Sequence, residues 1–373
     1  MASSCRADHA GSRCRLAEPR PVAKTQALRF DAIALTATTR GLLAAWSSTD
    51  GTLCRWLDHT GSPTSPATTV DAACPGGVAL ASRANTYYLA CSRPEAASDT
   101  GELVLYVLDR RLRVRAQRKL AEVGRDSRGV ALALVGHNLQ IVFHSGRLGD
   151  HAVYRAVIAP AVAAETASGT VRQDRLSSAA HVAADPALLV RGQDAYVTWS
   201  ETVVGFGPTL TRLMLARDAQ PARVLGETNT IMAAPRLVDQ GGGQLLLGYR
   251  RLSPRTGRET LVLARLQDDL PGPERPTAVG RANGEGSPEL LACGGLDVGV
   301  FPIVHGSERY VALHALDQQL RPIEENHQFY VSGHEYSQVA AACTGKTVVT
   351  LAAERKAPPN GGAELLAMEF ACR

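Results

Sequence analysis

The chain has 373 residues, of which 45% are hydrophobic and 20% charged, a composition that suits a folded protein with a large core and excludes extensive disorder. The net charge is +4 and the basic residues are spread along the whole chain, so we expect no nucleic-acid partner. No run of about 18 apolar residues occurs, which excludes a membrane-spanning helix.

Residues 1–18 form a polar leader without the apolar centre of an export signal. Two interpretations stay open: a cytoplasmic protein with a polar start, or an exported protein whose signal has been removed. Ala2, Ser3, Ser4 and Cys5 resemble the end of a bacterial lipoprotein signal, in which Cys5 would carry the lipid. Under that interpretation the leader is a linker, and the lipid is the expected contact with a membrane.

One plan of four short strands recurs along the chain. It is clearest in residues 78–120, which contain an apolar VALA, then TYYLAC, then ELVLYVLD, and last a more polar RVRAQRKL. A lone sheet of this size cannot bury both of its faces, so the copies must stack. Residues 19–29 resemble a fourth strand alone. Full copies are expected at residues 33–70 and 130–176 and from residues 186, 235 and 288, and a copy from residue 337 stops after its third strand.

The ends of the second strands recur at a nearly constant spacing. They fall 45 to 55 residues apart, at Trp46, Cys91, His144, Trp199, Tyr249, Val304 and Ala353. Third strands tend to close on an aspartate: Asp58, Asp109, Asp317 and, in looser form, Asp218 and Asp268. We expect these carboxylates to accept backbone hydrogen bonds at the turn into the fourth strand. Because the fourth strands carry the charge, we place them outermost as polar edges.

Seven such sheets around an axis resemble a seven-bladed β-propeller, whose blades have this period. The resemblance implies an all-β fold with four-stranded antiparallel blades in a single domain over residues 19–373. Residues 19–29 would close the ring by pairing with residues 363–372. A linear solenoid is the alternative, but it needs polar caps at both ends. No Trp-Asp dipeptide and no sialidase Asp box occurs, so no subfamily is indicated.

Eight cysteines favour an oxidising compartment and hence a periplasmic, cell-surface or secreted protein, although a cytoplasmic protein with buried thiols stays open. The propeller arrangement brings three pairs together: Cys14 with Cys372 across the ring closure, Cys74 with Cys91 on one rim, and Cys293 with Cys343 in adjacent blades. The first bridge would close a very long loop and contribute on the order of 4 kcal/mol. Cys54 has no evident partner.

We expect the functional surface on the face that carries the loops between second and third strands, because these loops are the longer and more varied ones. The residues nominated there for ligand binding are Trp46, His144, Trp199, Glu201, Tyr249, Arg250, His305 and Glu354. Further candidates are Asp50, Arg125, Asp150, His151, His181, Asp185, Glu285, His334 and Glu335. For Trp46 and Trp199 the alternative is packing between blades. His144, Asp150 and His151 could ligate a metal, and the alternative for them is a solvated loop.

These features predict a non-catalytic binding or scaffold propeller that recognises a protein, peptide or saccharide at one mouth of the channel, without a cofactor. The alternative is a propeller enzyme, a glycan or peptide hydrolase or lyase, in which His144, Glu201, His305 and Glu354 act as acid, base or ligand. No G-x-S-x-G, H-E-x-x-H, C-x-x-C or phosphate loop occurs. A purely structural repeat protein is the third possibility. Two ionisable groups close together in a channel-mouth pocket would favour the enzyme.

Overall fold

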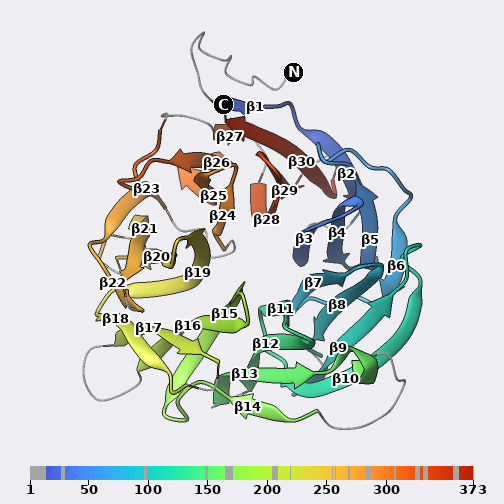
Figure 1. Cartoon of the computed structure of the whole chain (residues 1–373), viewed down its shortest axis with the longest axis horizontal. Helices are drawn as coiled ribbons and strands as arrows, with labels where there is room; N and C mark the ends of the chain where they lie inside the picture. The colour runs from blue at the N-terminus through green and yellow to red at the C-terminus, as the bar shows by residue number, and fades with distance from the viewer. Residues whose placement is uncertain are drawn as a thin grey trace.

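The computed structural model of the chain is a seven-bladed β-propeller (Figure 1). The first strand of each blade lies next to the central channel and the fourth lies at the outside, as predicted. The structure describes residues 14–26, 30–95, 99–147, 150–163, 171–203, 209–218, 220–253, 255–256, 258–267, 269–281, 287–305, 308–323, 328–330, 335–355 and 361–372.

The first three blades are antiparallel meanders in chain order. Blade one consists of β3 (Ala32–Thr38), β4 (Gly41–Ser48), β5 (Gly51–Leu57) and β6 (Thr68–Asp71). Blade two consists of β7 (Gly77–Arg83), β8 (Thr86–Arg93), β9 (Thr100–Leu108) and β10 (Val114–Gly124). Blade three consists of β11 (Val130–Val135), β12 (Asn138–Arg147), β13 (Asp150–Ile158) and β14 (Gln173–Arg175), with a short helix α1 (Pro160–Ala163) before its last strand.

The next three blades repeat the plan. Blade four consists of β15 (His181–Arg191), β16 (Asp194–Val203), β17 (Leu210–Arg217) and β18 (Arg223–Thr228). Blade five consists of β19 (Ile231–Gly241), β20 (Gln244–Leu252), β21 (Arg258–Gln267) and β23 (Arg275–Arg281), and the two-residue β22 (Leu270–Pro271) also pairs with β21. Blade six consists of β24 (Glu289–Cys293), β25 (Leu296–His305), β26 (Glu308–Leu316) and β27 (Gln328–Tyr330). A bridge between Arg281 and Val304 joins the sheets of blades five and six.

The last blade is shared between the two ends of the chain. It consists of β28 (Glu335–Thr344), β29 (Thr347–Arg355), β30 (Ala363–Cys372) and, from the other end, β2 (Arg20–Thr25), which pairs with β30 and closes the ring as predicted. Strand β1 (Cys14–Leu16) pairs with the far end of β30, so strand pairing begins ahead of residue 19. A disulfide joins Cys14 to Cys372 where the two strands meet.

Buried apolar side chains hold the ring together between blades rather than within them. Among the described residues they form seven clusters, and each cluster draws its members from two adjacent blades. Strand β4 is buried along its whole length because blades two and seven cover its two faces. Each blade therefore buries its faces against its neighbours, which is the reason that the repeat had to stack.

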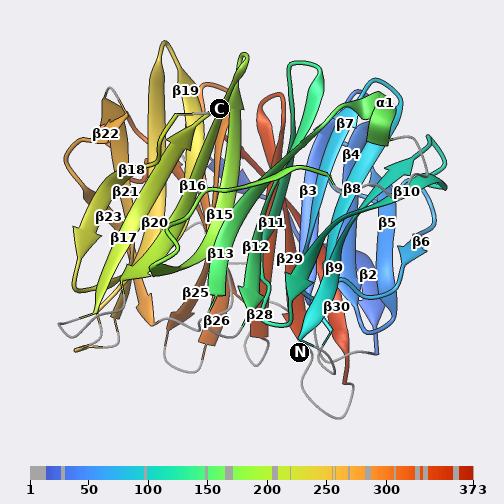
Figure 2. The same cartoon turned by 90° about the horizontal axis from the view of Figure 1, so that it is seen from below.

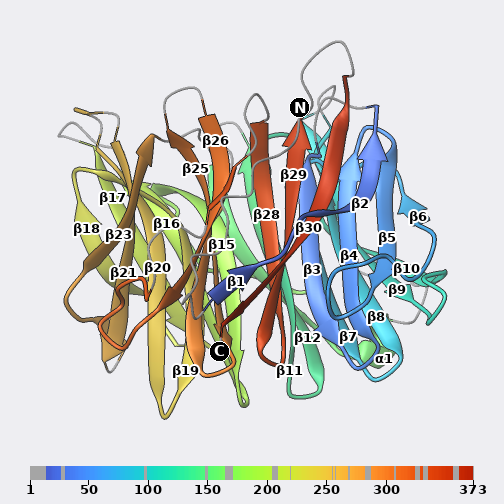
Figure 3. The ribbon, with the colours of Figure 1, turned by 90° about the horizontal axis from the view of Figure 1, so that it is seen from above.

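The strands run between two different faces of the ring (Figures 2 and 3). We call the face with the connections between second and third strands the loop face, and the face with the turns between first and second and between third and fourth strands the turn face. On the turn face the predicted aspartates act as expected, because the backbone N–H groups that follow Asp58, Asp109 and Asp317 donate to their carboxylates. Asp218 accepts instead from the Ala195 N–H at 2.8 Å, and Asp268 lies outside the described residues.

The predicted cysteine pairs all form. Cys74 is bonded to Cys91, and Cys293 to Cys343, in addition to the Cys14–Cys372 bridge. Cys54 is a free, buried thiol, and burial raises its pKa to about 12. No helix in the described part of the chain has the length and hydropathy needed to cross a membrane.

Candidate functional site

The nominated aromatic residues at the ends of the second strands point into the layers between blades. Trp46, Trp199 and Tyr249 are 3%, 0% and 2% exposed, and each belongs to an interblade cluster. Burial raises the pKa of the Tyr249 hydroxyl, which donates a hydrogen bond to Glu274. The structure thus places these three rings in the core, and their role in ligand binding stays a prediction.

Glu201 is the centre of a buried hydrogen-bonded group in blade four. Its carboxylate is 1% exposed and accepts hydrogen bonds from Trp199 Nε1 at 2.9 Å and from the Ser178 N–H at 3.1 Å. The other oxygen lies 2.8 Å from His181 Nδ1, at the start of β15. Glu201 therefore joins the end of β16 to the segment that enters the blade, and it fixes the orientation of the His181 ring.

His144, at the loop-face end of β12, is buried behind the channel. Its Nδ1 accepts a hydrogen bond from the Arg128 N–H at 3.0 Å, and its ring stacks on His151 at 5.5 Å between centroids. The pKa of His144 is lowered to about 4, mainly by burial and in addition by the neighbouring His151. The imidazole is therefore neutral at pH 7, with its proton on Nε2, and it supports the backbone that carries Arg128.

The other nominated residues lie at separate places on the loop face. Arg250 pairs with Glu259, Asp150 with Arg175, and the Thr25 hydroxyl donates to Asp50. Glu354 is 5% exposed. The side chains of His305 and Glu335, and the residues Cys5, Glu285 and His334, lie outside what the structure describes. In the described ranges, no group of three or more His, Cys, Asp and Glu side chains is placed to hold a metal ion.

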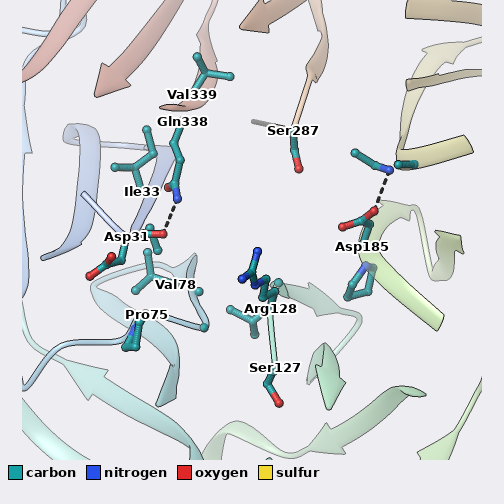
Figure 4. Close-up of a pocket in the computed structure, with 18 of the residues that line it drawn as sticks. Asp31, Ile33, Pro75, Val78, Ser127, Arg128, Asp185, Ser287, Gln338 and Val339 are labelled. Carbon is teal, nitrogen blue, oxygen red and sulfur yellow. Dashed lines mark hydrogen bonds between the residues drawn. The ribbon is translucent and has the colours of Figure 1, made fainter. Parts of the chain in front are cut away.

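A cavity of about 720 Å³ lies at the mouth of the channel on the loop face (Figure 4). The first strands and the segments that lead into them form its wall. Its apolar part comes from aliphatic side chains: Ile33, Val78, Val130, Ile231 and Val339. The ends of the second strands lie farther from the axis, and of the seven nominated residues whose side chains the structure describes, Arg250 alone lines this cavity.

The backbone is irregular near the start of several first strands, where register shifts occur between Ala184 and Ala187 and between Ala233 and Arg236. Gly77, Gly129, Asp185 and Ala234 adopt positive φ angles of 133°, 82°, 56° and 50°. Positive φ angles favour glycine. Among the other residue types, aspartate is one of those that adopt them most readily, as Asp185 does here. Hydrogen bonds link these turns between blades, from the Gly129 N–H to the Gly76 carbonyl at 2.7 Å and from the Ala234 N–H to Asp185 Oδ2 at 3.1 Å.

The charged groups of the cavity are mostly paired. Arg250 pairs with Glu259, and Arg236 lies 3.7 Å from Glu289. Among the described residues, Arg125 lies 3.8 Å from Asp99 and 3.9 Å from Asp126. Burial raises the pKa of the Glu289 carboxyl, although Arg236 opposes the shift.

Arg128 is different, because its guanidinium points toward the middle of the channel mouth (Figure 4) and pairs with no carboxylate of the described residues. Sequence analysis missed this residue. The signal was weak but present: Arg128 directly precedes Gly129 and the first strand of blade three, and these first strands are the ones that line the channel.

No family model matches this chain. No curated protein matches its sequence either. Among solved structures, it is similar to a Trypanosoma rangeli sialidase, with a TM-score of 0.46 and 8% identity over 92% of this chain and 54% of that one. It is also similar to the Bombyx mori GH32 β-fructofuranosidase BmSUC1, with a TM-score of 0.38 and 10% identity over 63% of this chain and 57% of that one.

A third similar structure is the endo-arabinase from Bacteroides thetaiotaomicron VPI-5482, with a TM-score of 0.38 and 8% identity over 65% of this chain and 91% of that one. The chain matches little more than half the length of the sialidase and the fructofuranosidase. At these identities the likeness extends to the fold alone.

Proposed function

We propose that the protein is a binding propeller that holds a carboxylate-bearing ligand in the cavity at the channel mouth. The observation that carries this proposal is the guanidinium of Arg128, directed into a 720 Å³ cavity without an ion-pair partner among the described residues. A guanidinium matches a carboxylate with two parallel hydrogen bonds, which makes it a specific receptor for that group.

The surroundings of Arg128 favour a short peptide over a sugar as the ligand. Aliphatic side chains line the cavity, and among its described lining residues the one aromatic ring, Phe30, is 1% exposed and offers no face for a sugar ring to stack on. An acidic side chain or a free C-terminus, next to an aliphatic residue, satisfies both the charge and the apolar wall. His144 supports this arrangement because its Nδ1 holds the Arg128 N–H in place.

A peptide array that includes acidic and C-terminal carboxylate sequences tests the proposal. We expect Arg128→Gln to weaken the binding of each ligand found by about 10- to 100-fold, which corresponds to the loss of a hydrogen bond to a charged group. Arg147→Gln is the matched control, since Arg147 belongs to the same blade and pairs with Glu122 at 3.6 Å without lining the cavity. The proposal is wrong if Arg128→Gln binds as tightly as the unmodified protein, or if no carboxylate peptide binds.

Glu289 favours a second candidate, a glycan hydrolase acting at the same cavity. Its carboxyl has a raised pKa, whereas the Glu259 carboxylate in the same cavity is paired with Arg250. Two carboxyl groups at one cavity, one of them with a raised pKa, are the kind of pair that glycoside hydrolysis uses. Release of reducing sugar from a glycan in a panel would support this candidate if Glu289→Gln abolishes the release. If no glycan releases sugar, the hydrolase candidate is wrong and the binding function remains.

We infer from the three disulfides that the protein works outside the cytoplasm, where such bonds persist. A periplasmic, cell-surface or secreted location fits this chemistry, and a lipid on Cys5 would tether the ring through residues 6–13. The intact mass of natively expressed protein distinguishes the cases. A mass that contains an unmodified Met1 would contradict both signal removal and the lipid.

A further inference from the structure

The turn face carries a second cavity, at the junction of blades one and two. Its volume is about 610 Å³, and it is lined by Arg40, Asn85, Arg110 and Arg111. Arg40 comes from the turn between β3 and β4, Asn85 from the turn between β7 and β8, and the other two from the turn between β9 and β10. Three arginines therefore line one hollow, and none of its described lining residues is acidic.

Hydrogen bonds fix the position of Arg40 in this hollow. Its Nη1 donates to the Arg110 carbonyl at 3.1 Å, and its guanidinium lies 5.0 Å from the centroid of the Trp56 ring. The same carbonyl accepts a hydrogen bond from Trp56 Nε1 at 3.2 Å, and Trp56 is 6% exposed. The contacts of Arg40 are thus with a ring face and one carbonyl, and both leave its charge uncompensated.

The turn that carries Arg110 and Arg111 is equally well defined. The carboxylate of Asp109 accepts hydrogen bonds from the Arg111 N–H at 2.8 Å and from the Arg113 N–H at 3.0 Å. Its ion pair is with Arg115, at 2.8 Å. Within the described ranges, no carboxylate pairs with the guanidinium of Arg110 or Arg111.

The equivalent turn of blade six shows that the fold does not need these two arginines. Asp317 accepts the corresponding hydrogen bonds from the Gln319 N–H at 2.7 Å and the Arg321 N–H at 2.9 Å. Leu320 and Leu112 have the same φ angle of 61°. An arginine from blade five even donates to the equivalent carbonyl, from Arg265 Nη1 to Gln318 at 2.6 Å. The two turns thus share a backbone, and glutamines in one stand where the other has Arg110 and Arg111.

We propose that the hollow lined by Arg40, Asn85, Arg110 and Arg111 binds a tetrahedral oxyanion with two negative charges, a phosphate or sulfate group. Positive charges that line one hollow repel one another, and a bound dianion offsets that repulsion. Guanidinium groups from two blades can donate to several oxygens of one such group, and the Asn85 amide adds an uncharged donor. The site lies on the face opposite to the channel mouth and is independent of the ligand proposed there.

The double variant Arg110→Gln/Arg111→Gln tests this site, because blade six shows that glutamine is compatible with the turn. Inorganic phosphate is titrated by calorimetry, with potassium chloride keeping the ionic strength constant so that general screening does not change. We expect saturable binding to the unmodified protein and binding at least tenfold weaker to the double variant. Phosphate should also raise the melting temperature of the unmodified protein and not that of the variant, whose melting temperature without phosphate stays close to the original.

The double variant Arg172→Gln/Arg223→Gln is the matched control, since it removes the same charge from exposed positions away from the hollow. It should bind phosphate like the unmodified protein. A second experiment distinguishes a lipid headgroup from a free anion. Vesicles that contain phosphatidic acid should bind the protein if the natural ligand is a lipid headgroup. Binding of inorganic phosphate without binding of the vesicles indicates a free anion. The proposal is overturned if phosphate does not bind saturably, or if Arg110→Gln/Arg111→Gln binds it as tightly as the control.

Discussion

His144 shows how one buried side chain makes the stability of the ring depend on pH. The groups that face it are Arg128, His151 and Asp185, and burial is the main reason that its pKa falls from 6.5 to about 4. Between these values the unfolded chain binds a proton at this residue and the folded chain does not. The folded state therefore has its full stability from this group above about pH 6.5 and loses it as the pH falls toward 4.

Replacing His144 by asparagine should remove this part of the pH dependence, because the amide oxygen can still accept from the Arg128 N–H but does not titrate. For the unmodified protein, we expect the free energy of unfolding to drop by up to about 3 kcal/mol between pH 6.5 and pH 4 on account of His144. Urea unfolding at a series of pH values measures it. His137→Asn is the control, as His137 is exposed, and parallel pH profiles for His144→Asn and the unmodified protein would contradict the assignment.

Single residues were also the scale at which the sequence predicted least about the site. The nominations rested on aromatic and ionisable side chains at the ends of second strands, such as Trp199 and Glu201, and the structure buries both. Which way a strand residue points depends on how neighbouring blades stack, and that information is spread over many residues of two blades. Arg125 and Asp185, which the sequence nominated from the segments between blades, do line the cavity, whereas Arg128 beside them was not nominated. The positive φ angle at Asp185 leaves little trace in the sequence.

The contact between blades two and three leaves no space for a side chain at the end of β10. A Cβ atom on Gly124 would lie 2.0 Å from the carbonyl oxygen of Gly146 in β12, which is part of the backbone and cannot move aside. A Cβ on Gly226 in β18 would meet nothing within 4 Å. The two glycines thus differ in the space around them, although both lie in outer strands.

We therefore expect Gly124→Ala to lower the free energy of unfolding by about 2 kcal/mol or more, as overpacking against backbone does. Gly226→Ala should be neutral or slightly stabilising, because alanine reduces the freedom of the unfolded chain. The midpoints of urea unfolding curves provide the comparison. Equal midpoints for the two variants would contradict this prediction, because they would mean that blades two and three can move apart at Gly124 without a loss of stability.

The elements themselves were largely predictable. The repeat of four strands, the outer position of the polar strand and the aspartates at three turns follow from local patterns of side chains, and the structure confirms them. Strands β1 and β22 and helix α1 were not expected. Each has at most four residues, so the sequence carries too few side chains to show a period.

Closure of the ring is a property of the whole molecule, and the Cys14–Cys372 bridge fastens it. The bonded residues are 358 positions apart, and removal of the bridge by Cys14→Ser/Cys372→Ser should lower the free energy of unfolding by on the order of 4 kcal/mol. The loss should be local at first, with faster hydrogen exchange in β2 and β30 than in the other blades.

The Cys74→Ser/Cys91→Ser variant is the control, because that disulfide joins residues only 17 positions apart, in blade two. It should leave the exchange of β2 and β30 unchanged and affect blade two instead. Exchange followed by mass spectrometry measures both. Loss of protection spread evenly over all blades in the Cys14→Ser/Cys372→Ser variant would contradict a local role for the bridge.

The pairing of the two chain ends could be foreseen because the sequence has a fourth strand without a blade at its start and a blade without a fourth strand at its end. The seven interblade clusters could not be assigned residue by residue, since each depends on the twist between two sheets. The sequence pattern thus predicts the order of the strands and blades, whereas the packing of neighbouring blades determines which side chains are in contact.

The shared last blade also sets the order of events during synthesis on the ribosome. Blades one to six can fold as they emerge, but the edge of β30 and the thiol of Cys372 appear last, while β2 and Cys14 have waited since the start. A polypeptide that stops before β30 would have neither the strand that pairs with β2 nor the cysteine that bonds to Cys14.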